Sequence, residues 1–238
     1  AIRWINEERD AEEPFFMFVA YHEPHEPIAS NHKYTKLYEG KGNPSRYDPS
    51  VSSFQAHHGN LTQMDSAFGR LIRHLDETHL RDNTVVFFTS DNGPAITGAH
   101  PHGSTGGLRD KKGSVYEGGI RVPSIISWPN GIAKGEVRDQ MTTGCDWLPT
   151  LADICDVPLP KRRLDGKSIS RILKSKDKPS PHKSFYWQLG NQWVVREGSW
   201  KLLGNPKDNA NKGPIGKDDK LFLANLEKDV SEMKNLAK

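Results

Sequence analysis

The chain has 238 residues, of which 33 are Lys or Arg and 30 are Asp or Glu, so its formal net charge is only +3. This near balance gives no support to nucleic acid or an anionic membrane surface as the partner. Hydrophobic residues make up 34% of the chain and the mean hydropathy is -0.72. No apolar run approaches the ~20 residues that span a bilayer. The length suits one large α/β domain, alone or with a small appendage.

The first ten residues contain early acidic residues and no apolar core, so they do not resemble a signal peptide. They are typical of the end of an amphipathic helix, and we expect Ala1 to be an interior residue of a longer chain. Cys145 and Cys155, ten residues apart, fit neither a metal motif nor a disulfide framework. We expect both to be small apolar core residues.

A continuous apolar run at residues 14–21 predicts a strand that is buried on both faces. It ends in the loop 22–27, His-Glu-Pro-His-Glu-Pro, which two prolines stiffen. Polar residues in a rigid loop at the end of a buried strand favour a functional site over a purely structural role.

Apolar residues recur at helical spacing over residues 54–75, which predicts one long helix packed on the sheet. The stripe consists of Phe54, Leu61, Met64, Phe68, Leu71, Ile72 and Leu75. His57, His58 and His74 lie near it, and we expect them to be partly buried with satisfied hydrogen bonds. A strand, this helix and a further strand form a βαβ unit, which is right-handed if the strands are parallel.

The central stretch, residues 84–93, ends in Asp-Asn-Gly. Residues 85–88 are all β-branched or aromatic, which predicts a buried strand. Ligands bind at the carboxyl ends of strands in open α/β sheets, and Asp91 and Asn92 offer the hard oxygen donors that Ca²⁺ and Mg²⁺ prefer. A β-turn is the alternative, since Asp-Asn-Gly is also a hairpin signal, but residues 94–107 show no returning strand.

A Gly- and His-rich loop at residues 98–107 precedes a basic stretch that contains Arg109, Lys111 and Lys112. Glycines permit close approach of the backbone to a ligand, and the three cations follow the proposed metal loop in sequence. A solvated basic face and an anion-binding site both remain open for this cluster.

Later segments predict a short strand at residues 124–128 and a helix at residues 146–155 with Asp146 as its N-cap. Residues 161–183 hold nine basic residues against two aspartates, which favours a solvated helix and linker, with binding of a polyanionic substrate as the alternative. Short aromatic and β-branched segments from residue 185 onward are typical of a small antiparallel sheet. Residues 231–237 predict a closing helical turn or two.

Four segments in order resemble the C-terminal part of a type I sulfatase of the alkaline-phosphatase superfamily, in particular carbohydrate sulfatases of the N-acetylgalactosamine-sulfatase and arylsulfatase kind. Residues 14–27 resemble the family's apolar strand with its His-x-Pro loop, and residues 83–94 resemble its Phe-Thr-Ser-Asp-Asn-Gly segment. Residues 112–123 resemble its Lys-x-x-x-Tyr/Phe-Glu-Gly-Gly-x-Arg-x-Pro segment. Residues 195–203 with 221–237 resemble the closing strands that end in Asn-Leu-Ala. Each motif is modest alone, whereas the ordered set is specific.

This resemblance implies an α/β fold, namely an incomplete three-layer α/β/α sandwich of alkaline-phosphatase type followed by a small antiparallel β-sheet subdomain with a C-terminal helix. Residues 1–178 would be the C-terminal portion of the catalytic α/β domain, and residues 182–238 the small β-rich subdomain.

The family also implies a sulfuric ester hydrolase that acts on a sulfated carbohydrate or aryl sulfate through a formylglycine nucleophile and a divalent cation, Ca²⁺ or alternatively Mg²⁺. Asp91 and Asn92 would be two metal ligands. His25 and Lys112 would hold the sulfate ester and assist the leaving oxygen. Further candidates for contacting the substrate are His100, His102 and Arg109.

The nucleophile motif Cys/Ser-x-Pro/Ala-x-Arg is absent, because neither Cys145 nor Cys155 is followed by the required residues. The family's paired aspartates and its Lys and His pair are absent too. We therefore expect formylglycine in a missing N-terminal half, and expect these 238 residues alone to be inactive with weak metal binding at best.

Two other functions remain open. A phosphodiesterase or phosphohydrolase of the same superfamily commonly uses Thr or Ser with two transition metals, which the Asp-Asn pair disfavours. A non-catalytic glycan-binding remnant would keep the fold without the nucleophile. The family further implies a periplasmic, extracellular or lysosomal location and a sulfate ester as partner, with neither nucleic acid nor a membrane span.

Overall fold

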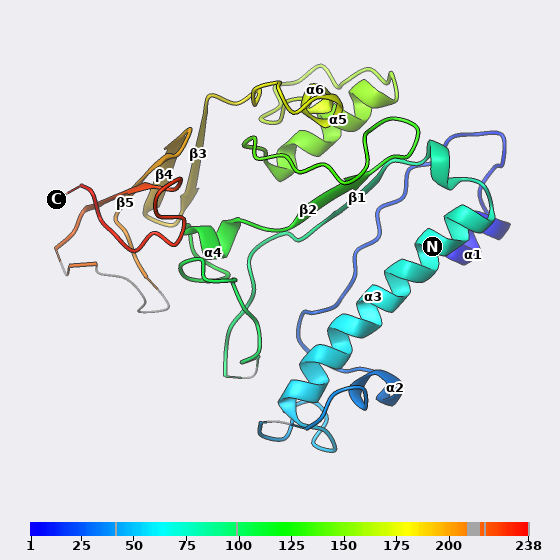
Figure 1. The fold of residues 1–238 in the computed structure, drawn as a ribbon, viewed down its shortest axis with the longest axis horizontal. Coiled ribbons are helices and arrows are strands. Elements are labelled where there is room, and N and C mark those ends of the chain that lie inside the picture. The colour runs from blue at the N-terminus through cyan, green and yellow to red at the C-terminus, as the bar shows by residue number, and fades with distance from the viewer. Residues whose placement is uncertain (41, 99, 209–214, 217, 238) are drawn as a thin grey trace. The chain divides into compact units, whose positions relative to one another are not determined.

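The structure, a computed structural model, describes residues 1–40, 42–98, 100–208, 215–216 and 218–237 (Figure 1). The chain forms two compact units: Ala1–Thr84 with Ala95–Gly103, and Val85–Pro94 with Ser104–Lys238. Ala99, within the predicted Gly- and His-rich loop, lies outside the described residues. The predicted boundary near residue 180 stays a prediction.

The first unit is organised around the long helix α3 (Ser53–Glu77), which confirms the helix predicted there. Its N-terminus is a capping box, in which Ser52 accepts from the backbone N–H of Gln55 and the Gln55 side chain accepts from that of Ser52. The short elements of this unit are α1 (Ile2–Glu7), α2 (His32–Thr35) and η1 (Arg81–Asn83). A Cβ at Gly59 would lie 3.0 Å from the backbone of Thr35, so α2 packs directly on α3.

The predicted apolar stripe of α3 is only half-buried along most of its length, and Leu75 is its one fully buried member. Packing of the stripe on a sheet stays a prediction. No helix formed by the described residues is both long enough and apolar enough to cross a bilayer.

Residues 14–21 form no strand, so the prediction of a buried strand there is wrong. Phe16 and Phe18 are 76% and 79% exposed. The run has the composition of a strand, but a strand also needs a neighbour for its backbone hydrogen bonds, and no described segment pairs with it. The predicted βαβ unit is therefore not formed by the described residues.

The second unit contains a two-stranded antiparallel sheet in which β1 (Val86–Thr89) pairs with β2 (Ser124–Ser127). Both predicted strands are confirmed, although β1 is half-buried along its whole length. A short helix α4 (Glu117–Ile120) precedes β2, and η2 (Gly144–Asp146), α5 (Trp147–Ile154) and α6 (Ser170–Lys174) follow it. Trp147 packs on Phe87 with ring centroids 4.9 Å apart, which fixes α5 on β1.

The predicted C-terminal antiparallel sheet is confirmed as a four-stranded meander in the order β3-β4-β5-β6 (Figure 1). Its strands are β3 (Ser184–Leu189), β4 (Gln192–Glu197), β5 (Trp200–Gly204) and β6 (Leu221–Asn225). Val194, Leu203 and Phe222 face one another across β4, β5 and β6 and are fully buried. This row forms the core on which Val115 and Tyr116 pack.

The predicted closing helix does not form among residues 231–237. Glu232 has a φ of 52°, which a right-handed helix cannot contain. The backbone N–H of Leu236 instead donates to Leu223 O at 2.8 Å, and Asn235 Oδ1 accepts from Leu223 N at 3.1 Å. The segment therefore runs alongside β6 and covers that edge of the sheet.

Two smaller predictions in this unit are also wrong. Cys145 and Cys155 are exposed free thiols and not core residues, because each sits at an end of α5 rather than on its packed face. The α5 helix is confirmed, but Asp146 makes no side-chain cap for it. Its carboxylate is engaged by segments outside the helix, which compete with the cap.

Candidate functional site

The Asp91-Asn92 pair lies in the loop that immediately follows β1. Asp91 is exposed and Asn92 is half-buried. The Ser90 hydroxyl donates to Asn92 O at 2.9 Å, and Asn92 Nδ2 donates to Gly93 O at 3.1 Å. These bonds use the nitrogen of the Asn92 carboxamide and leave its oxygen as an acceptor, so the loop offers a carboxylate and an amide oxygen.

The backbone just after this pair is clamped by a second segment. Gly93 N donates to Gly119 O at 2.9 Å, and Lys112 N donates to Pro94 O at 3.0 Å. A Cβ on Gly93 would lie 1.8 Å from Gly118 O, so no side chain fits between the two segments. The two bonds bring the loop with Asp91 and Asn92 beside the loop with Lys112.

Lys112 itself is half-buried, and no hydrogen bond or ion pair to a described residue engages its ammonium group. Its backbone is fixed while its cation is available. An available cation, on a loop that is hydrogen-bonded to the loop with the two oxygen donors, suits a site that holds both a divalent cation and an anionic group.

A buried cluster of charges anchors the Lys112 segment to the C-terminal sheet. Lys201 Nζ lies 3.0 Å from Glu117 Oε1 and 2.9 Å from Glu232 Oε1, and all three side chains are at most 1% exposed. The backbone N–H of Glu117 donates to Glu232 Oε2 at 2.6 Å. Burial raises the pKa of Glu232, while Lys201 and this backbone donor counteract the shift. The cluster therefore joins β5, the C-terminal segment and the start of α4.

Arg109 belongs to this buried region and is only 1% exposed. Its guanidinium pairs with Asp208 at 2.9 Å and donates to Glu232 O at 2.7 Å. It also stacks over the rings of Tyr116 and Phe222, 4.2 and 4.8 Å from their centroids. These contacts engage the buried guanidinium with groups of the protein, which makes Arg109 a structural anchor rather than a substrate contact.

In the first unit, neighbouring segments hold the loop 22–27. His100 Nε2 lies 2.9 Å from Pro24 O, and Glu26 accepts hydrogen bonds from the Tyr47 hydroxyl at 2.6 Å and from Thr97 at 3.4 Å. The Tyr47 hydroxyl lowers the pKa of Glu26. His25 is exposed in this loop, and its Nδ1 donates to Glu26 O at 2.8 Å, which leaves Nε2 as the second nitrogen of the ring.

Four histidines cluster at the N-terminal part of α3. The rings of His57 and His100 lie 4.9 Å apart, and His102 lies 6.0 Å from His57 and 6.1 Å from His58. Burial and the neighbouring imidazoles lower the pKa of His57 to about 4. Burial likewise lowers the pKa of His102, whose Nε2 lies 3.0 Å from Ser53 Oγ. The prediction of satisfied hydrogen bonds is wrong for two histidines of α3, because His57 Nδ1 and His74 Nε2 are buried with no hydrogen-bond partner among the described residues. His57 and His58 form one cluster with His100, which is 5% exposed, and with half-buried His102.

The described residues contain no group of three or more His, Cys, Asp or Glu arranged to hold a metal ion. Asp91 and Asn92 nevertheless fit two positions of a hard-cation site, because both present oxygen donors and neither oxygen is consumed by a cation of the protein. Further ligands would have to come from elsewhere.

Sequence reasoning missed the cluster of Glu117, Lys201 and Glu232. One signal was present: Lys201 is two residues from Leu203 in β5, so both side chains lie on the inward face of the strand. A lysine in such a position requires a buried acidic partner. The identity of the partners was not readable, since they lie 84 and 31 residues away in the sequence.

Comparisons with known proteins agree with this architecture. Residues 1–157 match the family model described as Sulfatase, and residues 105–238 match that of N-sulphoglucosamine sulphohydrolase, C-terminal. The chain is 34% identical to human arylsulfatase A over 194 residues, which are 79% of this chain and 35% of that protein. It is 29% identical to the N-acetylgalactosamine-6-O-sulfatase of Bacteroides thetaiotaomicron, over 95% of this chain and 44% of the relative.

Among solved structures, the PsFucS1 sulfatase from Pseudoalteromonas sp. superposes on this chain with a TM-score of 0.79 at 23% identity. The superposition includes 99% of this chain and 46% of the PsFucS1 chain. The fold is thus the α/β fold of alkaline-phosphatase type that sulfatases share. More particularly, the chain belongs to the sulfatase family. It spans less than half the length of these three relatives.

Proposed function

We propose that the protein hydrolyses a sulfate ester of a sulfated carbohydrate, or an aryl sulfate, with this chain contributing part of the catalytic site. One observation carries the proposal: the loop with Asp91 and Asn92 is clamped by backbone hydrogen bonds to the loop with Lys112. Family membership, and the carbohydrate substrate named for one relative, support the same class of reaction.

Asp91 and Asn92 would hold a divalent cation, Ca²⁺ or Mg²⁺, which when bound neutralises negative charge on sulfate oxygens. Lys112 binds and orients the sulfate ester through its available ammonium group. His25, exposed in the loop 22–27, would assist the leaving oxygen through its Nε2, since its Nδ1 is bonded to Glu26 O. His102 would contact the saccharide part of the substrate. His100, which is bonded to Pro24 O in the loop that carries His25, would contact it too.

The nucleophile proposed for this reaction is a formylglycine outside the residues of this chain, as are the remaining ligands of the cation. A location in the periplasm, in the exterior or in the lysosome is part of the same proposal. The 238 residues alone are expected to release no sulfate.

The test is sulfate release by the protein that carries this chain, with an aryl sulfate and a sulfated disaccharide as substrates. Loss of an outer-shell partner of a metal typically costs about 10- to 100-fold in activity. Asp91 is proposed as a direct ligand, so D91A should reduce kcat/KM by more than this. The control is D82A, which removes an exposed carboxylate from η1. Hydrolysis of a phosphodiester in preference to both sulfates would replace the proposal by the phosphohydrolase alternative, and saccharide binding without hydrolysis would replace it by the glycan-binding one.

A further inference from the structure

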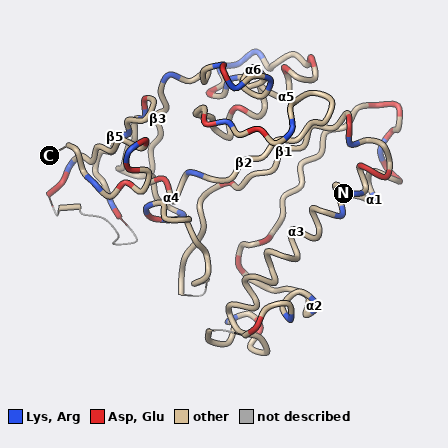
Figure 2. Tube along the Cα trace, viewed as in Figure 1, with Lys and Arg blue, Asp and Glu red and all other residues tan. Residues whose placement is uncertain are grey.

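Residues 161–183 concentrate positive charge in a chain that is otherwise slightly acidic. This segment contains nine Lys or Arg and two Asp, a net charge of +7, whereas the whole chain carries +3, which leaves -4 for the remainder. Figure 2 shows these positions as blue stretches at α6 and on the segment that leads from it towards β3. Charge of one sign along one stretch attracts polyanions.

A hollow of about 310 Å³ lies at the start of this segment. Its lining includes two arginines, Arg162 and Arg163, together with the apolar residues Leu148, Pro149 and Leu164. Both arginines are exposed, and no hydrogen bond or ion pair to a described residue engages their guanidinium groups. One guanidinium group can donate two parallel hydrogen bonds to two oxygens of the same anionic group. Apolar side chains can contact the C–H face of a sugar ring.

A second hollow, of about 710 Å³, continues from the first, since Pro149, Arg162 and Leu164 line both. Asp153 and Asp156 line the second hollow and oppose its cations. The hydroxyls of Ser168 and Ser170 donate to Asp153 and lower its pKa, so it stays ionised.

Both hollows have one positive charge in excess, since two arginines face Asp165 in the first, and Arg162, Lys167 and Arg171 face two aspartates in the second. The first hollow differs in its two adjacent arginines, whose guanidinium groups no described residue engages, whereas Lys167 Nζ in the second donates to Pro181 O at 3.0 Å. An anionic group is therefore better accommodated in the first hollow, and the second hollow is left for neighbouring sugars of a chain.

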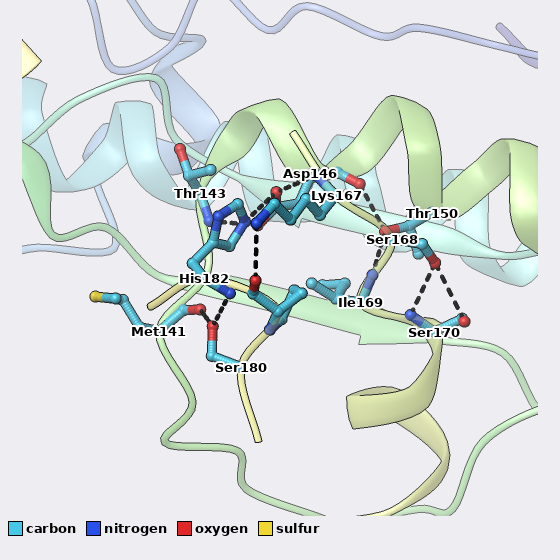
Figure 3. A network of polar contacts seen from close by, with 11 residues as sticks. Met141, Thr143, Asp146, Thr150, Lys167, Ser168, Ile169, Ser170, Ser180 and His182 are labelled. Atoms are coloured by element: carbon cyan, nitrogen blue, oxygen red, sulfur yellow. Dashed lines mark hydrogen bonds and ion pairs between the residues drawn. The ribbon is translucent and has the colours of Figure 1, made fainter. Parts of the chain in front are cut away.

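The part of the segment that follows the arginines, residues 167–169, is held against α5 and the residue before it by hydrogen bonds (Figure 3). The buried carboxylate of Asp146 accepts from Lys167 N at 2.9 Å and lies 2.7 Å from His182 Nε2. Ile169 N donates to the Thr150 hydroxyl at 3.0 Å. These contacts hold the segment on α5 before any ligand arrives, which lowers the entropic cost of binding.

We propose that the first hollow is a subsite for one sulfated sugar residue of a glycan chain, with Arg162 and Arg163 binding its sulfate and Leu148 with Leu164 contacting its ring. None of the residues that line it belongs to the loops with Asp91 and Lys112. The inference rests on the proposed function for its class of ligand, but it concerns binding and not hydrolysis.

Two cysteines provide the test. Cys145 lines the hollow, whereas Cys155 is equally a free exposed thiol and lines neither hollow. The protein that carries this chain is alkylated with N-ethylmaleimide, with and without dextran sulfate, and the two cysteine peptides are followed by mass spectrometry. At a concentration of about ten times the Kd, dextran sulfate should slow alkylation of Cys145 about tenfold, leaving Cys155 unchanged. Uncharged dextran should protect neither.

Charge reversal in R162E/R163E should abolish the protection of Cys145, and R162K/R163K, which keeps the charge but not the bidentate geometry, should weaken it. The matched control K228E/K234E changes the net charge equally at exposed positions of the C-terminal region and should retain protection. The circular dichroism spectrum of each variant, compared with that of the unsubstituted protein, shows whether the variant is folded.

Equal protection of both cysteines, equal protection by polyglutamate, or equal loss in the control variant would overturn the subsite, because each indicates attraction by charge alone. Sulfate release without protection of Cys145 would overturn the subsite but leave the proposed function. Protection of Cys145 without sulfate release would support the subsite and overturn the proposed function.

Discussion

At the scale of single residues, Gly93 is the position where the candidate site tolerates least change. Its backbone bonds to Gly119, and the space where a Cβ would lie is occupied by the carbonyl oxygen of Gly118. Any side chain must push the loop with Asp91 away from the loop with Lys112. In the sequence, the glycine of the Asp-Asn-Gly triplet is interpreted only by its backbone flexibility, as a turn signal. In the structure the absence of a side chain at Gly93 is equally needed.

We therefore expect G93A to lower the free energy of unfolding by about 3 kcal/mol, at the upper end of the cost of overpacking. Urea denaturation measures it. The control is G144A, because a Cβ at Gly144 meets no atom within 4 Å. Equal costs for the two substitutions would show that the two loops separate freely and that the clamp is not required.

Lys201 supports the second residue-scale prediction, since its ammonium lies between two fully buried carboxylates. Arg121 and Arg196 lie farther from one of them, at 3.8 Å from Glu117 Oε2. K201M should cost about 3 to 5 kcal/mol, because both carboxylates are left without their buried partner. The same substitution at exposed Lys220, just before β6, should cost less than about 0.5 kcal/mol.

A double-mutant cycle distinguishes this explanation from simple loss of packing. Adding E232Q to K201M removes one of the stranded charges and should recover part of the lost stability. If E232Q instead adds its full separate cost, the two side chains are not coupled and the ion cluster does not hold the C-terminal segment.

At the scale of elements, the histidine cluster on α3 should make the first unit sensitive to acid. The folded state holds the pKa of His57 at about 4, below the ordinary value of 6.5. Between these values the unfolded chain binds a proton that the folded chain does not, so stability falls as the pH drops from 6.5 towards 4. Solvent screening reduces the effect to on the order of 1 to 2 kcal/mol.

Urea midpoints measured between pH 4 and 7 check this expectation, and H57F, which cannot titrate, should flatten the profile. The groups that face His57 are His58, His100 and His102, all of which oppose its protonation. The exposed His22 provides the control H22F, which should keep the slope of the natural protein. An unchanged slope in H57F would assign the acid sensitivity to another group.

Elements whose cause is local were predictable from the sequence. The periodicity of α3, the β-branched run of β1 and the aromatic alternation of β3 to β6 each act within a few residues of the chain. Features that depend on distant partners were not. Arg109 could be read as a ligand contact only because its buried partner Asp208 lies 99 residues away. Of the site, the sequence placed the oxygen pair and Lys112, but not the clamp that joins them.

At the scale of the whole molecule, residues 14–21 leave an apolar segment exposed. Its backbone groups pair with no described strand, and Phe16 and Phe18 are more than three-quarters exposed. An unpaired apolar run of this kind adds readily to the edge of another sheet. We expect the isolated 238-residue chain to self-associate as its concentration rises, through this segment.

The variant F16S/F18S should lower the association of the isolated chain about tenfold or more, since two large apolar side chains contribute about 1.5 to 3 kcal/mol each when buried. Sedimentation velocity over a range of concentrations measures it. The control L37S/V137S removes two other apolar side chains, 63% and 79% exposed, that belong to no strand. An equal effect of both variants would mean that general apolar exposure drives the association. A specific effect of F16S/F18S would show that the isolated chain associates through residues 14–21.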